Sequence, residues 1–241
     1  MPAFNVVHVL EKTISELSSN CYDEIILVDD GSQDGTAELG LKLGLTVVRH
    51  PKNRGYGAAQ KTGYKTALDK GATIIVLLHG DNQYDPSFVD LFVKKLTEED
   101  FDLVTGTRMV LGDALSKGMP VWKFIPNRFL TWLENCAFKT QVSDYHNGFR
   151  AYSARFLSQV PLDLLSEKFD FDTDIMIQGI IRKYKIGEVP HPARYAEENS
   201  QMSFLKGIVY GVSILRTIFI YSLHNTGLYP QKVFSLTPLK S

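Results

Sequence analysis

The sequence has few cysteines and no excess of charge of either sign. Cys21 and Cys136 are the two cysteines among 241 residues. They match neither a metal-binding spacing nor a disulfide framework, so we expect two reduced, packed thiols. The 26 Lys and Arg residues against 27 Asp and Glu give a formal net charge of -1. Because a broad polyanion-binding surface needs excess positive charge, we expect no nucleic-acid partner.

Long apolar runs are also missing. The first residues have no basic region ahead of an apolar stretch, so we expect no secretion signal. No uninterrupted apolar run reaches the roughly 18 residues of a membrane span. The nearest approach, from Gly207 to Leu223, contains Arg216. These absences predict a cytoplasmic protein.

Short β-branched runs alternate with helical patterns in the first half of the chain. The runs at residues 24–28, 45–48, 73–78 and 101–106 are nearly continuous in apolar character, which is typical of strands buried on both faces of a parallel sheet. Apolar residues recur at helical spacing between them, in residues 8–17, 58–71 and 86–96. This order predicts an α/β domain with right-handed crossovers.

The second half is less regular. We expect helices within residues 117–139 and 169–184, a short strand at 185–190 and an apolar helix at 204–223. No linker separates a second folded domain. We therefore assign residues 1–200 to the main domain and residues 201–241 to an apolar C-terminal helix and tail.

Polar residues follow each of the four predicted strands. The strand ends carry DDGSQDGT, RHPKNRGYGAA, HGDNQYDP and GTR, and ligands of open α/β sheets bind at this rim. Taken singly, DDGS is ordinary turn chemistry, and Asp85 before Pro86 is a better helix N-cap than a ligand. Asp81, with Gln83 two residues on, suits a hard cation such as Mg²⁺ or Mn²⁺.

The motifs together resemble the family 2 glycosyltransferases, enzymes with a GT-A fold, and above all the dolichol-phosphate or polyprenyl-phosphate mannosyl- and glucosyltransferase branch. PAFN is similar to the PAYN start of the family and VDDGSQDGT to its second motif. NRGYGAAQKTGYKTA resembles its nucleotide loop, and HGDNQYDP stands in the place of its metal motif. The resemblance implies a GT-A fold, with a Rossmann-like, mainly parallel sheet flanked by helices.

The resemblance also implies a role for each matching residue. Residues near the nucleotide are Pro2, Ala3, Phe4, Asn5, Asp29, Asp30, Arg54 and Lys61, with His79 as a further contact. The cation, Mg²⁺ or Mn²⁺, is held by Asp81 with Gln83 nearby. Residues on the acceptor and reaction side are Arg108, Arg128, Asp144 and Arg150.

These roles describe an inverting enzyme that moves a hexose from a GDP- or UDP-sugar to a polyprenyl or dolichyl phosphate. A metal and cationic side chains would stabilise the charge that builds on the leaving pyrophosphate. Arginines suit a phosphate acceptor, which needs no base. Two alternatives stay open. One is a glycan hydroxyl acceptor with Asp144 as general base, and the other is a non-catalytic nucleotide-sugar-binding subunit.

The chain departs from the family pattern at two places. His79 stands where the family has an acid, and we favour a nucleotide contact or a structural histidine over metal ligation. In the family a buried strand precedes the PAYN turn, whereas Met1 here directly precedes Pro2, so the first strand is expected to be missing. Such a loss would expose two strand edges, and we favour an upstream start or a trimmed chain over a natural omission.

The C-terminal segment bears on the acceptor class. Phe204, Ile208, Val212 and Leu215 fall on one helical face, and Lys206 and Arg216 could reach toward headgroups. This pattern predicts a helix lying at the cytoplasmic membrane face. Packing on the domain or in a homodimer interface is an equal alternative.

Overall fold

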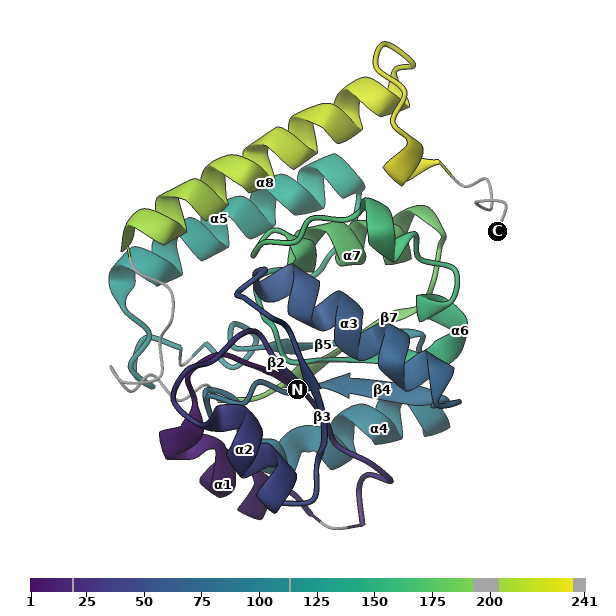
Figure 1. Cartoon of the computed structure of the whole chain (residues 1–241). Coiled ribbons are helices and arrows are strands. Elements are labelled where there is room, and N and C mark those ends of the chain that lie inside the picture. The colour runs from purple at the N-terminus through teal and green to yellow at the C-terminus, as the bar shows by residue number, and fades with distance from the viewer. Residues whose placement is uncertain (19, 113, 193–203, 236–241) are drawn as a thin grey trace.

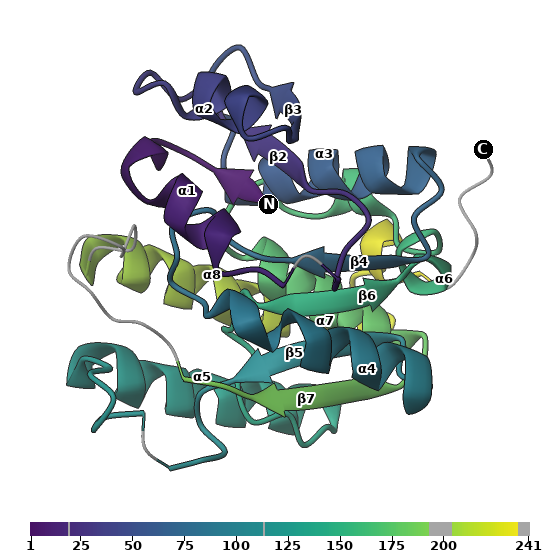
Figure 2. The same ribbon diagram turned by 90° about the horizontal axis from the view of Figure 1, so that it is seen from below.

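The computed structural model describes residues 1–18, 20–112, 114–192 and 204–235. A central layer of strands is covered by helices on both faces, with α3 on one side and α4 on the other (Figures 1 and 2). The strands are β1 Pro2–Ala3, β2 Ile26–Asp29, β3 Thr46–Arg49, β4 Ile74–Leu77, β5 Leu103–Thr107, β6 Arg150–Ser153 and β7 Ile186–Pro190.

Six of the described α-helices overlap predicted ranges, whereas those at Thr36–Lys42 and Ala154–Leu157 were not predicted. The α-helices are α1 Val7–Ser15, α2 Thr36–Lys42, α3 Tyr56–Asp69, α4 Val89–Glu98, α5 Val121–Phe138, α6 Ala154–Leu157, α7 Phe171–Ile181 and α8 Phe204–Asn225. Short 3₁₀ turns lie at Pro86–Phe88, Leu162–Leu164 and Lys232–Phe234. Asp85 accepts a hydrogen bond from the backbone N–H of Ser87, which confirms its prediction as an N-cap.

The strands form two hydrogen-bonded sheets with the orders β1-β2-β3 and β4-β6-β5-β7. β2 pairs in parallel with β1 and β3, and β5 pairs in parallel with β7. β6 runs antiparallel between β4 and β5, and the sequence patterns did not predict this strand. It brings the Asp144–Arg150 segment back to the rim where β4 and β5 end.

The start of the PAFN turn forms a two-residue strand, β1. Pro2 and Ala3 pair in parallel with Val28 and Asp29, and the Met1 nitrogen donates to the carbonyl of Ile26 at 2.8 Å. β1 lies within the PAFN turn, so it does not contradict the expectation that the strand ahead of this turn is missing.

Two further predictions need correction or fall outside the described residues. Both cysteines are free thiols, but Cys136 is exposed on α5 and so is not packed as expected. The expected boundary at residue 200 lies within residues 193–203, outside the described residues. After that segment, α8 packs along α5 (Figure 1).

Candidate active site

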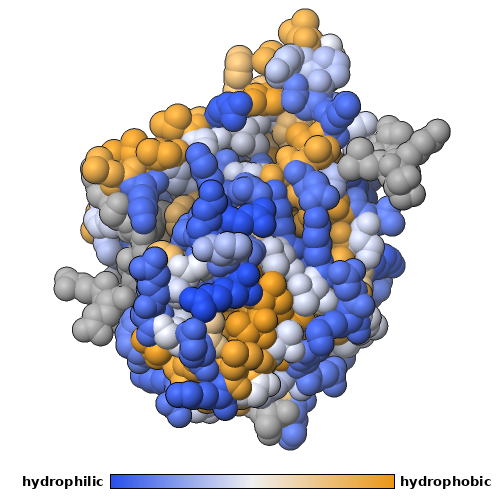
Figure 3. Space-filling view, viewed as in Figure 1, coloured by the Kyte–Doolittle hydropathy of each residue, from blue (hydrophilic) through white to orange (hydrophobic). Residues whose placement is uncertain are grey.

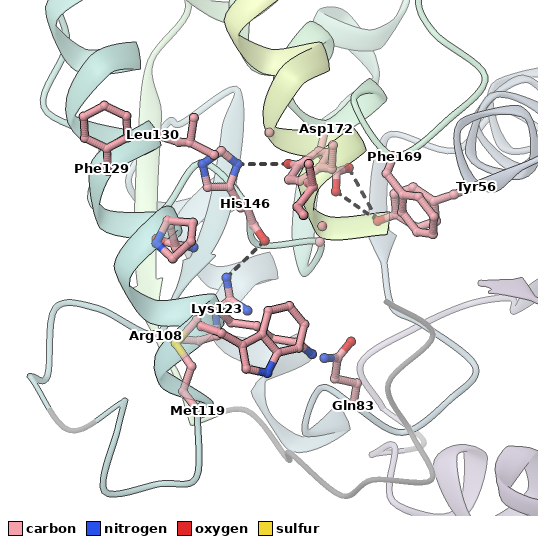
Figure 4. A pocket seen from close by; sticks show the side chains of 18 of the residues that line it. Tyr56, Gln83, Arg108, Met119, Lys123, Phe129, Leu130, His146, Phe169 and Asp172 are labelled. Atoms are coloured by element: carbon pink, nitrogen blue, oxygen red, sulfur yellow. Dashed lines mark hydrogen bonds between the residues drawn. The ribbon is translucent and has the colours of Figure 1, made fainter. Parts of the chain in front are cut away.

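A cavity of about 430 Å³ opens beyond the ends of β4 and β5 and extends between α5 and α8. Polar groups such as Gln83, Arg108 and Asp172 and apolar groups such as Phe129 and Leu130 both line it (Figure 4). Its polar lining is Tyr56, His79, Asp81, Gln83, Tyr84, Arg108, Lys123, Asn127, His146 and Asp172. Its apolar lining includes Met119, Trp122, Phe129, Leu130, Ile208, Val212 and Leu215.

Asp81 lines this cavity from the turn that follows β4. Its carboxylate accepts a hydrogen bond from the backbone N–H of Gln83 at 3.1 Å, and Asn82 between them takes a positive φ of 56°. Asx turns of this kind fix the carboxylate at the strand end. Burial disfavours the charged form and raises the pKa of Asp81 to about 6. Such a site favours a cation that would neutralise the carboxylate.

Few candidate metal ligands line the cavity. The described residues contain no group of three His, Cys, Asp or Glu side chains that could hold a metal. Asp81 and Gln83 both line the cavity. If these two side chains hold a cation, one carboxylate and one amide oxygen would leave most of a Mg²⁺ or Mn²⁺ shell to water and to phosphate oxygens, which is common for these cations.

His79 is held by its neighbours. Its Nε2 is hydrogen-bonded to the hydroxyl of Tyr56 at 2.8 Å, and its ring packs edge-on against Tyr56 and Tyr84. Burial lowers the pKa of His79 to about 3, so the imidazole is neutral. A Cβ at Gly148 would lie 2.8 Å from Nε2, so glycine there leaves room for this ring.

Arg108 and Asp144 form a buried, bidentate ion pair. Nε donates to Oδ2 at 2.8 Å and Nη2 to Oδ1 at 3.0 Å, and Asn127 also donates to Oδ1 at 2.9 Å. Burial acts to raise the pKa of Asp144, but the charge and hydrogen bonds of Arg108, with Asn127, outweigh it and hold the pKa well below its usual range. Arg108 also donates to the carbonyl of His146 (Figure 4), so its orientation is fixed.

Asp29 and Asp30 shape the turns around them. Asp29 accepts from the N–H of Ser32 at 3.0 Å. Asp30 accepts from the N–H groups of Arg54 and Gly55, each at 2.9 Å. The Pro2–Asn5 turn is joined to the same region, since the side chain of Asn5 accepts from the N–H of Gln33. Pro2, Ala3, Phe4 and Asn5 do not line the cavity.

Four basic residues proposed from the sequence lie away from the cavity lining. Arg54 is exposed and pairs with Glu167 at 3.1 Å. Lys61 is buried and donates to the carbonyl of Leu165. Arg128 is exposed on α5. Arg150 is fully buried and donates to the carbonyls of Asn147, Asp172 and Tyr145, so it links the Tyr145–Asn147 loop to the first turn of α7.

Several lining residues were not singled out from the sequence. Asp172, in the first turn of α7, accepts from Tyr56 and Gln60, each at 3.2 Å, and burial raises its pKa. Lys123 lies in the first turn of α5; burial, followed by the charge of Arg108, lowers its pKa. The acid-rich start FDFDTD was the available sequence signal for Asp172. The helical pattern around Lys123 did not indicate which face lines a cavity.

Comparison with known proteins identifies the family. Residues 1–160 match the family described as Glycosyl transferase family 2. An uncharacterized protein of Methanocaldococcus jannaschii is 35% identical over 218 residues, covering 89% of this chain and 87% of that protein. A UDP-N-acetylglucosamine–dolichyl-phosphate N-acetylglucosaminyltransferase of Methanococcus voltae is 27% identical, covering 82% and 85%. A polyprenol monophosphomannose synthase of Mycolicibacterium smegmatis is 24% identical, covering 79% and 74%.

Solved structures agree on the fold. Glucosyl-3-phosphoglycerate synthase from Mycobacterium tuberculosis in complex with UDP has a TM-score of 0.70 at 20% identity, covering 96% of this chain and 79% of that one. The complex of the same enzyme with Mn²⁺, UDP-glucose and phosphoglyceric acid has a TM-score of 0.69 at 20% identity, with the same coverage. These structures support the predicted GT-A fold. The chain belongs to glycosyl transferase family 2.

Proposed function

We propose that the protein is a metal-dependent inverting glycosyltransferase that moves a hexose from a nucleoside-diphosphate sugar to a polyprenyl or dolichyl phosphate. The observation that carries this proposal is that one cavity is lined both by Asp81 and Arg108 and by apolar side chains of α5 and α8. Two relatives are named for transfer involving dolichyl phosphate or polyprenol, in keeping with such an acceptor.

Asp81 and Gln83 would hold the cation, and the donor diphosphate would complete its shell. The half-buried carboxylate with a raised pKa fits this use, because a cation removes the cost of keeping it ionised. When bound, the cation supplies positive charge to the leaving diphosphate. UDP and Mn²⁺ in the fold neighbours support UDP-sugars and Mn²⁺ as the first choices to test, with GDP-sugars and Mg²⁺ as the alternatives.

The acceptor phosphate would lie between the metal end and the apolar end. Arg108 and Lys123 both line the cavity there, and guanidinium and ammonium groups bind phosphate oxygens strongly. A phosphate oxygen would attack the anomeric carbon as the bond to the diphosphate breaks, and the bonding electrons would leave with the diphosphate. The prenyl chain would follow the side chains of Phe129, Ile208 and Val212.

A glycan hydroxyl is disfavoured as acceptor by the state of Asp144. A general base for a hydroxyl works best with a pKa near the working pH, whereas the pKa of Asp144 is held well below its usual range by Arg108 and Asn127. An anionic acceptor needs no base. Asp144 then acts by positioning Arg108, and Arg150 by bracing the loop that carries both Asp144 and His146.

The apolar outer surface of α5 and α8 supports contact with a membrane. Leu205–Asn225 of α8 is long and apolar enough to cross a membrane by length and composition, although Arg216 interrupts its apolar run. However, α8 packs along α5 and lines the cavity, so we favour a helix that lies on the membrane surface. Both helices carry exposed apolar residues, namely Trp122, Ile125, Phe129, Trp132, Ile208, Val209, Val212 and Phe219. Figure 3 shows hydrophobic surface gathered over the start of α8.

A transfer assay tests the proposal. Purified protein is incubated with labelled UDP- or GDP-hexoses, Mn²⁺ or Mg²⁺ and a polyprenyl phosphate in detergent, and lipid-extractable label is measured. The expected result is metal-dependent label in the lipid phase, reduced by about 100-fold or more in Asp81→Asn. Binding of donor without transfer across the whole donor panel would instead support a non-catalytic nucleotide-sugar-binding protein.

A further inference from the structure

Few buried contacts hold α8 to the rest of the molecule. Ile214 is the one buried residue among residues 205–225 of this helix, and Val209 is 69% exposed. The helix packs along α5, where a Cβ at Gly211 would lie 3.7 Å from Cδ1 of Leu130. Because few apolar side chains are buried in this contact, displacing α8 from α5 costs less than opening the core of the domain.

His146 joins α8 to the buried part of the domain. Its ring lies between α5 and α8 (Figure 4). Nδ1 is hydrogen-bonded to the hydroxyl of Tyr210, on α8, at 2.9 Å, and the two rings pack edge-on. Nε2 lies 3.2 Å from Oε2 of Glu134, on α5, a fully buried carboxylate that also accepts from Thr173 of α7. The carboxylate favours a proton on Nε2, which leaves Nδ1 to accept from Tyr210.

The backbone of His146 holds Arg108. Nη2 of Arg108 donates to the carbonyl oxygen of His146 at 3.0 Å. The N–H of His146 donates to Oδ1 of Asp144 at 3.3 Å, and the same oxygen accepts from Arg108. Since ring and backbone belong to one residue, a shift of α8 that moves the ring also moves the carbonyl oxygen. The position of α8 and the orientation of Arg108 are therefore linked through His146.

The same cavity contains both the apolar contact of the two helices and the guanidinium. His146, Tyr210 and Arg108 line it, and so do apolar side chains of both helices, such as Leu130 of α5 and Val212 of α8. An apolar chain bound there would contact both helices and keep α8 against α5. In that position Tyr210 is bonded to His146, so a phosphate meets a guanidinium that is already oriented, which lowers the cost of binding.

We propose that His146 is a positioning residue that couples the binding of an apolar chain between α5 and α8 to the binding of a phosphate at Arg108. The proposal rests on the proposed function, which places the acceptor phosphate at Arg108. By linkage, each of the two ligands raises the affinity for the other by the same factor. The coupling therefore favours an acceptor that carries a prenyl chain and a phosphate together over either part alone.

The test uses the two parts as separate ligands, geraniol for the apolar chain and inorganic phosphate for the charged group. The Kd of phosphate is measured from the NMR signal of the Arg108 Nε–H, with and without saturating geraniol. We expect geraniol to lower this Kd by about fivefold or more in the parent chain. Tyr210→Phe removes the hydroxyl and keeps the ring, and geraniol should then change the phosphate Kd by less than about twofold.

Two further variants separate coupling from stability. Tyr221→Phe is the control on the same helix, where the Tyr221 ring packs against Phe138 and Phe234, and it should keep the full effect of geraniol. His146→Phe keeps an aromatic ring without its nitrogens and should lose the effect as Tyr210→Phe does. A purely structural role of the hydroxyl would lower Tm but leave the effect of geraniol on phosphate affinity as in the parent chain.

Three outcomes would overturn the proposal. An equal phosphate Kd with and without geraniol in the parent chain would show that the two ligands are not coupled. A full effect of geraniol in both Tyr210→Phe and His146→Phe would show that the coupling does not pass through His146. An Arg108 signal that phosphate does not move would remove the proposed acceptor site and the coupling with it. Only this last outcome also counts against the proposed function, so the two failures are distinguishable.

Discussion

Arg108 and Asp144 are joined by two hydrogen bonds, Nε to Oδ2 at 2.8 Å and Nη2 to Oδ1 at 3.0 Å. The pair fixes a guanidinium in the wall of the cavity and keeps the carboxylate ionised. Asp144 was proposed from the sequence as a catalytic residue and a candidate base. Its geometry supports a positioning role, because the carboxylate oxygens are already engaged by Arg108 and Asn127.

Asp144→Asn should therefore impair acceptor binding more than the chemical step. Loss of the ion pair frees Arg108 to move, and breaking a buried pair costs about 3–5 kcal/mol. We expect a lower Tm and an acceptor KM raised by about tenfold, with the pH profile of kcat unchanged. A kcat reduced by orders of magnitude, with loss of the basic limb of the profile, would identify Asp144 as a general base.

Lys123 and Arg128 provide a matched comparison on α5. Lys123 lines the cavity beside Arg108, whereas Arg128 is exposed and outside the lining. Lys123→Ala should raise the KM for the lipid phosphate by about tenfold or more, since it removes a charge near the acceptor. Arg128→Ala should change it by less than about twofold. Acceptor KM is measured from initial rates over a range of acceptor concentrations. A larger increase in Arg128→Ala than in Lys123→Ala would support the acceptor contact first expected for Arg128.

Metal affinity should depend on the protonation of Asp81. Its folded pKa of about 6 lies above the ordinary 3.8, so a cation must displace a proton below about pH 6. Apparent Mn²⁺ affinity should weaken by about tenfold per pH unit below that point and level off above it. Without metal, the same raised pKa makes stability fall as pH rises from about 4 to 6.

Calorimetric titration of Mn²⁺ at several pH values measures this dependence. Asp81→Asn should bind Mn²⁺ weakly at every pH, and its stability should lack the Asp81 contribution to the pH dependence. Mn²⁺ binding in Asp81→Asn as tight as in the parent chain would place the cation elsewhere.

Tyr56 should stabilise the folded protein through its hydrogen bonds to His79 and Asp172, which line the cavity. Its hydroxyl is bonded to His79 Nε2 at 2.8 Å and to Asp172 at 3.2 Å. Tyr56→Phe leaves two buried polar groups with one partner fewer, at a cost of about 1–3 kcal/mol. Tyr22→Phe, at a partly exposed site, is the control and should be neutral in chemical denaturation. Equal stability of the two variants would mean that water replaces the lost hydroxyl.

The exposed face of α8 should bind anionic lipid vesicles. Val209 and Phe219 are 69% and 62% exposed, and a glutamate at either site adds the cost of placing a charge at the lipid surface. Val209→Glu and Phe219→Glu should reduce vesicle co-flotation, while Leu41→Glu, at an equally exposed apolar site of α2, should not. A different result would favour a homodimer interface on this face. In that case the two variants co-float with vesicles as the parent chain does, and sedimentation shows a molecular mass that rises with protein concentration.

The sequence predicted the strands that border the site better than the side chains that line it. Buried runs such as Ile74–Leu77 mark strands because both faces are apolar, and glycines and acids after them mark the rim. β6 was missed because its four residues, Arg150–Ser153, are too short and mixed to show a period. The family and the GT-A fold predicted from the motifs are confirmed.

Contacts across the fold could not be predicted in the same way. Tyr56 and Asp172 are separated by 116 residues and Arg108 and Asp144 by 36, and no local pattern reports such pairings. Arg150 follows a family motif, yet its side chain turns into the core because three backbone carbonyls there need a donor. The apolar end of the cavity depends on how α8 lies on α5, which amphipathic spacing alone does not determine.

The most direct test of the account compares a polyprenyl phosphate with the matching polyprenol as acceptors. The two differ only in the phosphate, which Arg108 and Lys123 are proposed to hold. We predict transfer to the phosphate at a rate at least about 1000-fold above transfer to the alcohol, since Arg108 and Lys123 would hold the phosphate and the carboxylate of Asp144 is engaged by Arg108 and Asn127. Equal rates for the two lipids, or faster transfer to the alcohol, would contradict the account.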